Sequence, residues 1–219
     1  KAGTVVEELV STTDISATVL SLAGAKIPDY ITAKPLIGIE KSEYRQYVRS
    51  ARDIWDEIDE CSRSITTADF KYIRNHMPEV PWATDQAYLE INRPALHVMR
   101  RLKQEGRLSA RELTFFADQK PLEELYDLGK DPEELNNLAE NSEYAPVLRT
   151  MRAHEAQWQM ANHDLGLADL GRRKPEKWLA AERARAGIKK NEPELWKRLE
   201  AGELMKTQTW MKKYKSLKK

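Results

Sequence analysis

The sequence predicts a mixed α/β protein in which helices precede and follow a group of β-strands. Apolar residues recur at helical spacing over residues 11–24, 84–106 and 147–158. Over residues 44–75 polar and apolar residues alternate loosely, as they do in half-buried strands, and a shorter strand-like run, LEELYDL, follows at 122–128. With 219 residues, 41% of them apolar and 32% charged, the chain can bury one core, or one core with an appendage.

Local signals mark the ends of the first helix and the turn between two strands. Thr13 or Asp14 is placed to cap the first free amides of the helix over 11–24, and Gly24 suits the left-handed conformation that ends a helix. The run CSRSITTADFKYIRN predicts two strands joined by a turn near Ala68 and Asp69. The apolar residues at helical spacing in the first helix are Ile15, Val19 and Leu22.

The next helical region, TDQAYLEINRPALHVMRRLKQEG, is predicted to contain a break. Thr84 is its expected cap, Gly106 its stop, and Pro94 should end or kink the helix after Arg93, because proline lacks the backbone donor. SARE at Ser109–Glu112 is a capping box and predicts another short helix. A further helix is predicted from the stripe formed by Val147, Met151, His154 and Trp158.

The stretch ELYDLGKDPEELNNLAEN, residues 124–141, predicts a strand, a turn and a helix start in close succession. Gly129 is expected to turn the chain, and Asp131 to cap a helix whose first residue is Pro132. Glu133 and Glu134 would then lie in the first turn, where the helix dipole favours negative charge.

Charge is distributed unevenly, although the net charge is only +1. Residues 172–219 contain 16 Lys and Arg against 6 Asp and Glu, whereas residues 1–171 contain 20 against 29. An acidic body followed by a basic tail favours either packing of the tail on the body or an anionic partner for the tail. Two helices are predicted in the tail. Its aromatic residues, which include Trp196, Trp210 and Tyr214, are more typical of a packing surface than of nucleic-acid contact.

Residues with catalytic potential are sparse. Cys61 in CSRS has only Arg63 as an electropositive neighbour, which favours a structural cysteine over a reactive one. The histidines are dispersed and no zinc-binding spacing occurs. His76 differs from His97, His154 and His163, because it follows a predicted strand end, where side chains often line a cleft.

The densest polar group lies in RSARDIWDEIDE. Arginine suits planar oxyanions that accept two hydrogen bonds, and carboxylates suit sugar hydroxyls or amines. From composition alone a solvated turn with weak ion pairs explains the group better than a binding site does. Its charged members are Arg49, Arg52, Asp53, Asp56, Glu57, Asp59 and Glu60.

Three stretches, in this order, resemble the C-terminal part of the sulfatases, in the alkaline-phosphatase superfamily. KAGTVVEELVSTTDISATVLSLAGAKIPD resembles the segment joining the last elements of the catalytic domain, with Ala17 where proline is usual. RSARDIWDEIDECSRSITTADFKYIRNHMPEVPW resembles a region found in bacterial enzymes acting on sulfated carbohydrates. ELYDLGKDPEELNNLAE resembles the closing signature, ELYDL-x-x-DP-x-E-x-x-NLA. The resemblance covers about residues 1–164.

The resemblance implies an α/β catalytic domain followed by a small antiparallel sheet backed by a helix. Residues 1–40 would be the last elements of the catalytic domain, residues 41–165 the sheet and helix subdomain, and residues 166–219 a basic helical extension. It also implies hydrolysis of sulfate esters or N-sulfate groups by a formylglycine made from Cys or Ser, assisted by calcium.

The family's modification motif, C/S-x-P-S-R, does not occur in these residues, and Cys61 lacks its proline and spacing. No catalytic residue and no metal ligand is therefore assigned. We expect the chain to be inactive alone, to need the N-terminal catalytic part of the same protein as its partner, and to expose apolar surface within its first thirty or so residues. This surface would otherwise contact the sheet of the catalytic domain.

In this family the C-terminal subdomain closes one side of the substrate pocket. The resemblance therefore implies a sulfated carbohydrate as partner, in a periplasmic or secreted protein, with neither a membrane nor a nucleic acid expected. The contacts would be hydrogen bonds to hydroxyls or to a neighbouring carboxylate or sulfate, not proton transfer. The residues expected to contact substrate are Arg52, Asp53, Asp56, Glu57 and His76.

Two alternatives stay open at this point. Relatives on the same scaffold hydrolyse phosphodiesters or phosphonates and would carry a different nucleophile motif. A non-enzymatic binding module whose basic tail meets nucleic acid or a partner protein would instead be a stable, free-standing fold with salt-dependent binding.

Overall fold

The computed structural model describes residues 3, 5, 7–38, 45–55, 58–93, 95–170, 183 and 185–203. The chain divides into two compact units, each built from separate stretches of sequence. The first unit combines Lys1–Ala51, Arg63–Arg74 and Glu123–Asp164, and the second combines Arg52–Ser62, Asn75–Leu122 and Leu165–Lys219.

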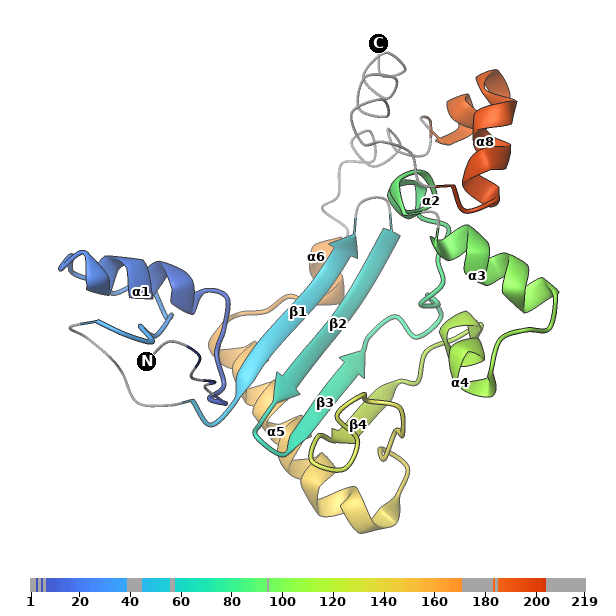
Figure 1. Ribbon diagram of the computed structural model, residues 1–219. Helices are drawn as coiled ribbons and strands as arrows, with labels where there is room; N and C mark the ends of the chain where they lie inside the picture. The colour runs from blue at the N-terminus through green and yellow to red at the C-terminus, as the bar shows by residue number, and fades with distance from the viewer. Residues whose placement is uncertain are drawn as a thin grey trace. The chain divides into compact units, whose positions relative to one another are not determined.

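Four strands form one sheet: β1 (Val48–Trp55), β2 (Ile58–Thr66), β3 (Phe70–Asn75) and β4 (Glu123–Asp127). Each strand lies beside the one that precedes it in the sequence (Figure 1). β3 and β4 pair antiparallel, with Tyr72 opposite Leu125. The mixed α/β class and the strands predicted within 44–75 and 122–128 are thus confirmed.

The turn between β2 and β3 falls at the predicted position and is organised by Thr67. The Thr67 hydroxyl oxygen accepts hydrogen bonds from the backbone N–H groups of Asp69, at 3.3 Å, and Phe70, at 2.9 Å. The Thr67 N–H donates to the Phe70 carbonyl at 2.8 Å. A threonine side chain that satisfies the turn in this way fixes the register of the hairpin.

The core of the first unit lies between the sheet and one long helix, α5 (Ala145–Ala161) (Figure 1). The predicted stripe on this helix is largely correct, since Met151 is buried and Val147 packs at the edge of the core. A short 3-10 helix, η2 (Ser142–Tyr144), precedes α5. The buried cluster consists of Ile65, Tyr72, Leu125, Leu148 and Met151.

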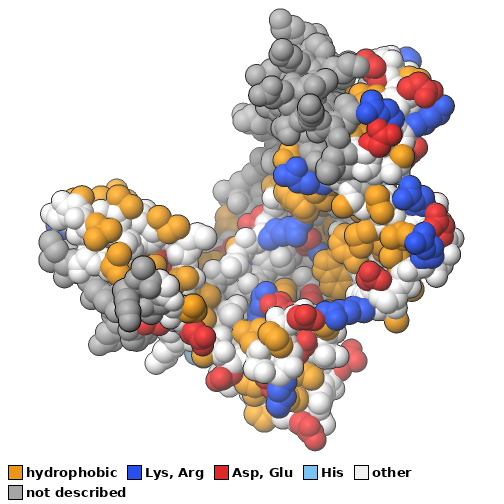
Figure 2. Space-filling model, in the orientation of Figure 1, with side chains coloured by type: hydrophobic (Ala, Val, Ile, Leu, Met, Phe, Trp, Pro, Cys, Tyr) orange, Lys and Arg blue, Asp and Glu red, His pale blue; other side chains and the backbone are white. Residues whose placement is uncertain are grey.

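The first helix, α1 (Asp14–Leu22), ends as predicted before Gly24, whose φ of +67° is left-handed. The predicted caps are wrong: the Thr13 side chain makes no capping hydrogen bond, and the Asp14 carboxylate binds other groups. The apolar face of α1 carries exposed side chains, as Figure 2 shows, and this agrees with the expectation of exposed apolar surface here. Ile15, Val19 and Leu22 are 61%, 59% and 60% exposed.

The segment after β4 is an irregular loop, so the helix predicted to begin at Pro132 is wrong. The Asp131 carboxylate accepts hydrogen bonds from the Leu135 and Asn136 amides, at 2.8 and 2.7 Å, as in a turn. Glu134 has a φ of +55°, which a right-handed helix cannot continue through.

The loop instead binds the edge of β4 through hydrogen bonds of the Asn137 side chain, and we call this contact the Asn137 clasp. The Asn137 Oδ1 accepts a hydrogen bond from the Leu125 amide at 2.9 Å, and its Nδ2 donates to the Glu123 carbonyl at 2.9 Å. The Leu138 amide donates to the Leu125 carbonyl at 2.8 Å. The edge of the sheet thereby gains partners that a neighbouring strand would otherwise supply.

The second unit begins its helical part with α2 (Ala87–Asn92) and α3 (Ala95–Gln104), separated at the position where Pro94 predicted a break. The predicted stop at Gly106 is confirmed by its φ of +66°. The predicted cap at Thr84 is wrong, because α2 begins after Gln86. The capping box of Ser109 and Glu112 is present at α4 (Ala110–Leu113), which continues into the 3-10 helix η1 (Thr114–Phe116).

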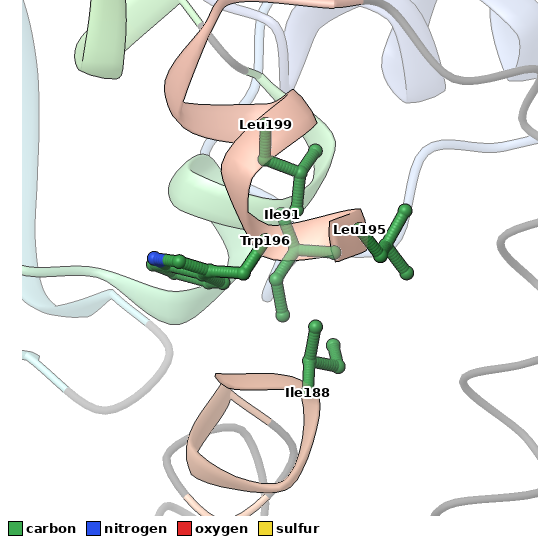
Figure 3. Close-up of a cluster of buried hydrophobic side chains, with 5 residues drawn as sticks. All are labelled: Ile91, Ile188, Leu195, Trp196 and Leu199. Carbon is green, nitrogen blue, oxygen red and sulfur yellow. The ribbon is translucent and has the colours of Figure 1, made fainter. Parts of the chain in front are cut away.

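The C-terminal extension packs on α2 of the second unit through apolar side chains within residues 188–199. It contains α6 (Leu167–Leu170), helical residues 185–191 and α8 (Pro193–Glu200). Figure 3 shows the side chains of Leu195, Trp196 and Leu199 from α8 gathered with Ile188 around Ile91 of α2. This arrangement supports the tail-on-body alternative for these residues. Trp210 and Tyr214 lie outside the described residues.

A buried histidine and an ion pair add to this packing. The His97 ring meets Trp196 edge-on, with 5.4 Å between ring centroids, and His97 Nε2 lies 3.0 Å from the Glu90 carbonyl oxygen. Arg185 Nη1 lies 2.9 Å from a carboxylate oxygen of Glu90. His97 is thus a core residue. None of the described helices is long and apolar enough to cross a membrane.

Candidate functional site

The structure places three of the five expected substrate contacts, and it does not describe Asp56 and Glu57. Arg52 and Asp53 lie on β1, whereas His76 directly follows β3, with β2 between the two strands. Arg52 is exposed, and its guanidinium carbon lies 4.7 Å from the centre of the Trp55 ring. These positions neither confirm nor contradict a role in substrate binding.

A hollow of about 480 Å³ lies in the second unit, and its lining includes Ile58 and Asp59, which follow Arg52 and Asp53 closely in the sequence. The charged residues of its described lining are Asp59 and Asp85, and the Asp85 carboxylate forms an ion pair with Arg100 at 2.6 Å. Carboxylates suit sugar hydroxyls and repel sulfate. Its other lining residues are Ile58, Val80, Pro81, Ala83 and Thr84.

A larger hollow, of about 710 Å³, lies in the first unit, and we call it the Arg49 hollow. Among the described residues that line it, three side chains are cationic, two are aromatic and none is acidic. Hydroxyl and amide side chains make up most of the rest. The lining residues are Ser11, Thr13, Thr32, Lys34, Arg45, Gln46, Tyr47, Val48, Arg49, Trp158 and Asn162.

Aromatic rings position the Arg49 side chain in this hollow. Its guanidinium carbon lies 4.2 Å from the centre of the Tyr47 ring and 5.8 Å from that of Trp158 on α5. The Tyr47 ring lies 5.1 Å from the ring of His154, also on α5. Trp158 of the predicted α5 stripe therefore lines a polar hollow, and His154 of the same stripe packs against Tyr47 without lining it. The guanidinium gains cation–π stabilisation from the two rings.

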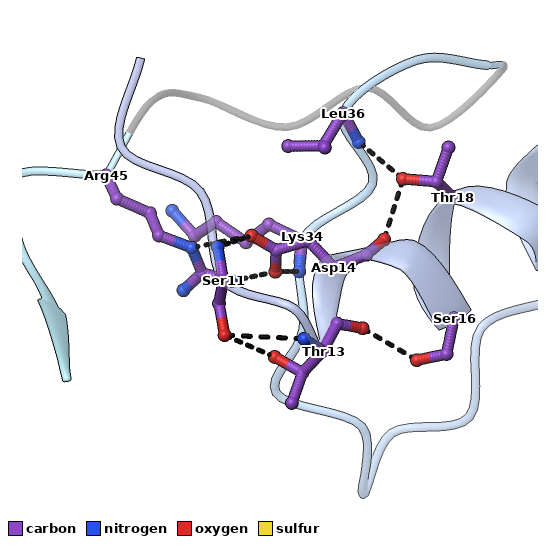
Figure 4. Close-up of polar contacts among 8 residues, drawn as sticks. All are labelled: Ser11, Thr13, Asp14, Ser16, Thr18, Lys34, Leu36 and Arg45. Atoms are coloured by element: carbon purple, nitrogen blue, oxygen red, sulfur yellow. Dashed lines mark hydrogen bonds and ion pairs between the residues drawn. The ribbon is translucent and has the colours of Figure 1, made fainter. Parts of the chain in front are cut away.

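The wall formed by the N-terminal segment is held by Asp14, which is fully buried (Figure 4). Its carboxylate accepts hydrogen bonds from the Ser11 and Lys34 amides, both at 2.8 Å, and forms an ion pair with Arg45. Burial alone would raise the pKa of Asp14, but the hydrogen bonds from Arg45, Lys34 and Ser11 lower it below its ordinary value. The carboxylate is therefore ionised at neutral pH and offsets the charge of Arg45.

Arg49 differs from Arg45 because no acidic side chain among the described residues forms an ion pair with it. Its Nε is shielded from solvent and has no hydrogen-bond partner in the described part of the chain. A shielded donor left unsatisfied costs about 1–3 kcal/mol. A built-in cation with a free donor, stacked on an aromatic ring, is an arrangement that can bind a planar oxyanion.

Arg49 belongs to the polar group of RSARDIWDEIDE but is not among the residues predicted to contact substrate. A signal was present, because Arg45, Tyr47 and Arg49 alternate in YRQYVR and alternate residues of an extended chain share one face. Lys34 and Trp158 are distant in the sequence, so only the fold shows that they join this face.

Cys61 is fully buried on β2, which agrees with the structural interpretation. Beside it, Glu60 and Lys120 form a buried ion pair with 2.5 Å between the charged atoms. Neither group is exposed enough to meet a substrate. Within the described ranges, no cluster of three or more His, Cys, Asp or Glu side chains could hold a metal ion.

Comparisons with known proteins identify the class to which these features belong. The chain is 36% identical over 157 residues to an ulvan-active sulfatase of Formosa agariphila, across 72% of this chain and 26% of that protein. A second ulvan-active sulfatase of the same organism is 27% identical over 171 residues, across 75% of this chain and 32% of that protein. The solved structure of a 2-O GAG sulfatase matches with a TM-score of 0.49 and 21% identity, over 78% of this chain and 28% of that one.

No protein-family model matches the chain. The chain spans about a quarter to a third of the length of these two curated relatives. The curated matches confirm the resemblance inferred from the sequence: the chain is related to the sulfatases and corresponds to a C-terminal portion of one.

Proposed function

We propose that this chain completes the substrate pocket of a sulfatase that hydrolyses sulfate esters or N-sulfate groups of a sulfated carbohydrate. The 36% identity over 157 residues carries this proposal, because that relative and the second curated one are both described as ulvan-active sulfatases. The closing signature ELYDLGKDPEELNNLAE supports it, because it resembles the closing signature of the sulfatases.

The role proposed for this chain is recognition of the substrate, not chemistry at sulfur. Sulfatase resemblance implies calcium and a formylglycine, but the described residues do not fit a calcium site. Catalysis is assigned to a part of the protein that carries the modification motif, and the 219-residue chain alone is expected to be inactive.

The expected substrate contacts remain Arg52, Asp53, Asp56, Glu57 and His76. Arg52 has the most favourable setting among those described, because an exposed guanidinium supported by an aromatic ring loses little freedom on binding an oxyanion. In this chain joined to a sulfatase catalytic part, we expect Arg52→Gln to raise KM for a sulfated oligosaccharide several-fold while kcat changes little, because the lost contact is made before and during the reaction alike.

The exposed apolar face of α1 supports a catalytic part of the same protein as the partner of this chain. Ile15, Val19 and Leu22 expose most of their side chains at helical spacing, and a contiguous apolar surface of this kind favours coverage by another surface. A free-standing binding module would have little reason to leave such a face uncovered.

The decisive experiment compares the 219-residue chain with the same chain joined to a sulfatase catalytic part that carries C/S-x-P-S-R. Sulfate released from sulfated polysaccharides is measured, with phosphodiester and phosphonate substrates in parallel. Sulfate release by the joined protein and none by the chain alone supports the proposal. Preferential phosphodiester or phosphonate hydrolysis favours the related hydrolases, and tight, salt-dependent nucleic-acid binding by the chain alone favours a binding module.

A further inference from the structure

We infer that the Arg49 hollow is a subsite for an anionic group of a polysaccharide, either a sulfate ester or a uronate carboxylate. The inference rests on the proposed function for the kind of ligand, but its evidence is separate, because the described residues expected to contact substrate, Arg52, Asp53 and His76, do not line this hollow. The subsite would bind a charged group other than the one that is hydrolysed. It would thereby make binding depend on the pattern of charges along the polysaccharide.

Charge is the first argument. The described lining contains Lys34, Arg45 and Arg49 and no acidic side chain. Asp14 forms an ion pair with Arg45, whereas Arg49 has no acidic partner among the residues that the structure describes. The hollow therefore carries an excess of positive charge within a body whose first 171 residues are acidic overall. A local reversal of sign attracts an anionic ligand to this place on the molecule.

Geometry is the second argument. Stacking on Tyr47 at 4.2 Å holds the guanidinium in one plane, and its shielded Nε has a free proton to donate. Sulfate and carboxylate accept two parallel hydrogen bonds from such a fork. An oxyanion that reaches Nε would supply the missing acceptor, so binding removes an unfavourable feature of the unliganded hollow.

The rest of the lining suits a sugar ring. Tyr47 and Trp158 offer aromatic surface, and the hydroxyl groups of Ser11, Thr13 and Thr32 can exchange hydrogen bonds with sugar hydroxyls. The volume of about 710 Å³ lies within the range of about 300–1,000 Å³ that is usual for ligand pockets. A free inorganic anion would use only the cation, so a sugar-borne anion should bind more tightly than sulfate alone.

The test uses the full 219-residue chain and the Arg Nε–H signals in nuclear magnetic resonance spectra. The probes are a sulfated ulvan oligosaccharide, the same oligosaccharide after desulfation, a non-sulfated uronate oligosaccharide and inorganic sulfate. We expect the Arg49 Nε–H signal to shift with the sulfated oligosaccharide at lower concentration than with inorganic sulfate. Loss of the shift on desulfation identifies sulfate as the bound group, and a shift retained with the uronate identifies carboxylate.

Variants measured by calorimetry complete the test. Arg49→Gln should weaken oligosaccharide binding at least about tenfold, the loss expected for a hydrogen bond between charged groups. Arg49→Lys keeps the charge but loses the planar fork, and it should fall between Arg49→Gln and the parent chain. Arg149→Gln is the matched control. Arg149 is exposed on α5, and its substitution removes the same charge from outside the hollow.

An unmoved Arg49 signal at saturating oligosaccharide overturns the inference, as does equal weakening by Arg49→Gln and Arg149→Gln. The signal is read in the parent chain, so the test stands even where a variant fails to fold. Failure of the proposed function looks different: the joined protein would release no sulfate, whatever the Arg49 signal does. Sulfate release with an unmoved Arg49 signal would leave the function intact and remove the subsite.

Discussion

Asn137 offers a sharp test of how the closing signature stabilises the fold. Its Oδ1 accepts hydrogen bonds from the Leu125 and Ala139 amides at 2.9 and 3.0 Å, and its Nδ2 donates to the Glu123 carbonyl at 2.9 Å. Asn137→Ala removes all three bonds without touching the backbone. Because Leu125 is fully buried, its amide would then have no ready replacement from water.

The expected cost follows from these contacts. Each hydrogen bond contributes about 0.5–1.5 kcal/mol, and a buried amide left without an acceptor costs about 1–3 kcal/mol. Ala139 and Glu123 are nearer to solvent, so water replaces much of what they lose. We therefore expect Asn137→Ala to lower the free energy of unfolding of the first unit by about 2–4 kcal/mol.

Urea unfolding followed by circular dichroism measures this loss, and amide hydrogen exchange in β3 and β4 assigns it to the first unit, because two units need not unfold together. Asn136→Ala is the matched control, since the Asn136 side chain is exposed and should cost less than about 0.5 kcal/mol. If Asn137→Ala and Asn136→Ala are equally stable, the clasp does not hold β4 and the reasoning is refuted.

Three further predictions concern the pH dependence of stability, the apolar core of the second unit and the buried ion pair of Lys120 and Glu60. The hydrogen bond from Arg152 lowers the pKa of Glu123 to about 2 from 4.5. The contribution of ionised Glu123 to stability is therefore complete above about pH 4.5 and is lost as the pH falls towards 2. The difference in free energy of unfolding between the parent chain and Glu123→Gln should shrink between about pH 6 and about pH 3, and a constant difference would contradict this. Leu199→Ala empties a fully buried site and should cost the second unit about 2–5 kcal/mol in urea unfolding, with exchange in β3 and β4 unchanged. Lys120→Met leaves Glu60 buried and unpaired and should lower the free energy of unfolding by about 3–5 kcal/mol. The double variant Lys120→Met with Glu60→Leu should regain much of this stability. If the single and the double variant are equally destabilised, the two charges are not coupled.

Much of the local structure follows from short-range signals. The capping box at Ser109, the stop at Gly106 and the turn at Thr67 were predictable or explicable from neighbouring residues, because each depends on hydrogen bonds or backbone angles within a few positions. The errors occur where a side chain has a better partner far away. Asp14 does not cap α1 because the Lys34 amide and Arg45 bind its carboxylate, and the loop after Asp131 is not a helix because Asn137 pairs with β4.

The sequence by itself therefore determined the relationship to the sulfatases and the order of the helices and strands, apart from the helix wrongly predicted at Pro132, since both depend on short motifs along the chain. Only the tertiary structure decided which cations form a site. Arg49 and Tyr47 are neighbours in the sequence, whereas Lys34 and Trp158 are 124 positions apart. All four line the same hollow, and Trp158 reaches it because α5 packs on the sheet. Long-range packing also gave Arg45 an acidic partner and left Arg49 without one in the described part of the molecule, a difference that two arginines in the same strand-like run do not reveal.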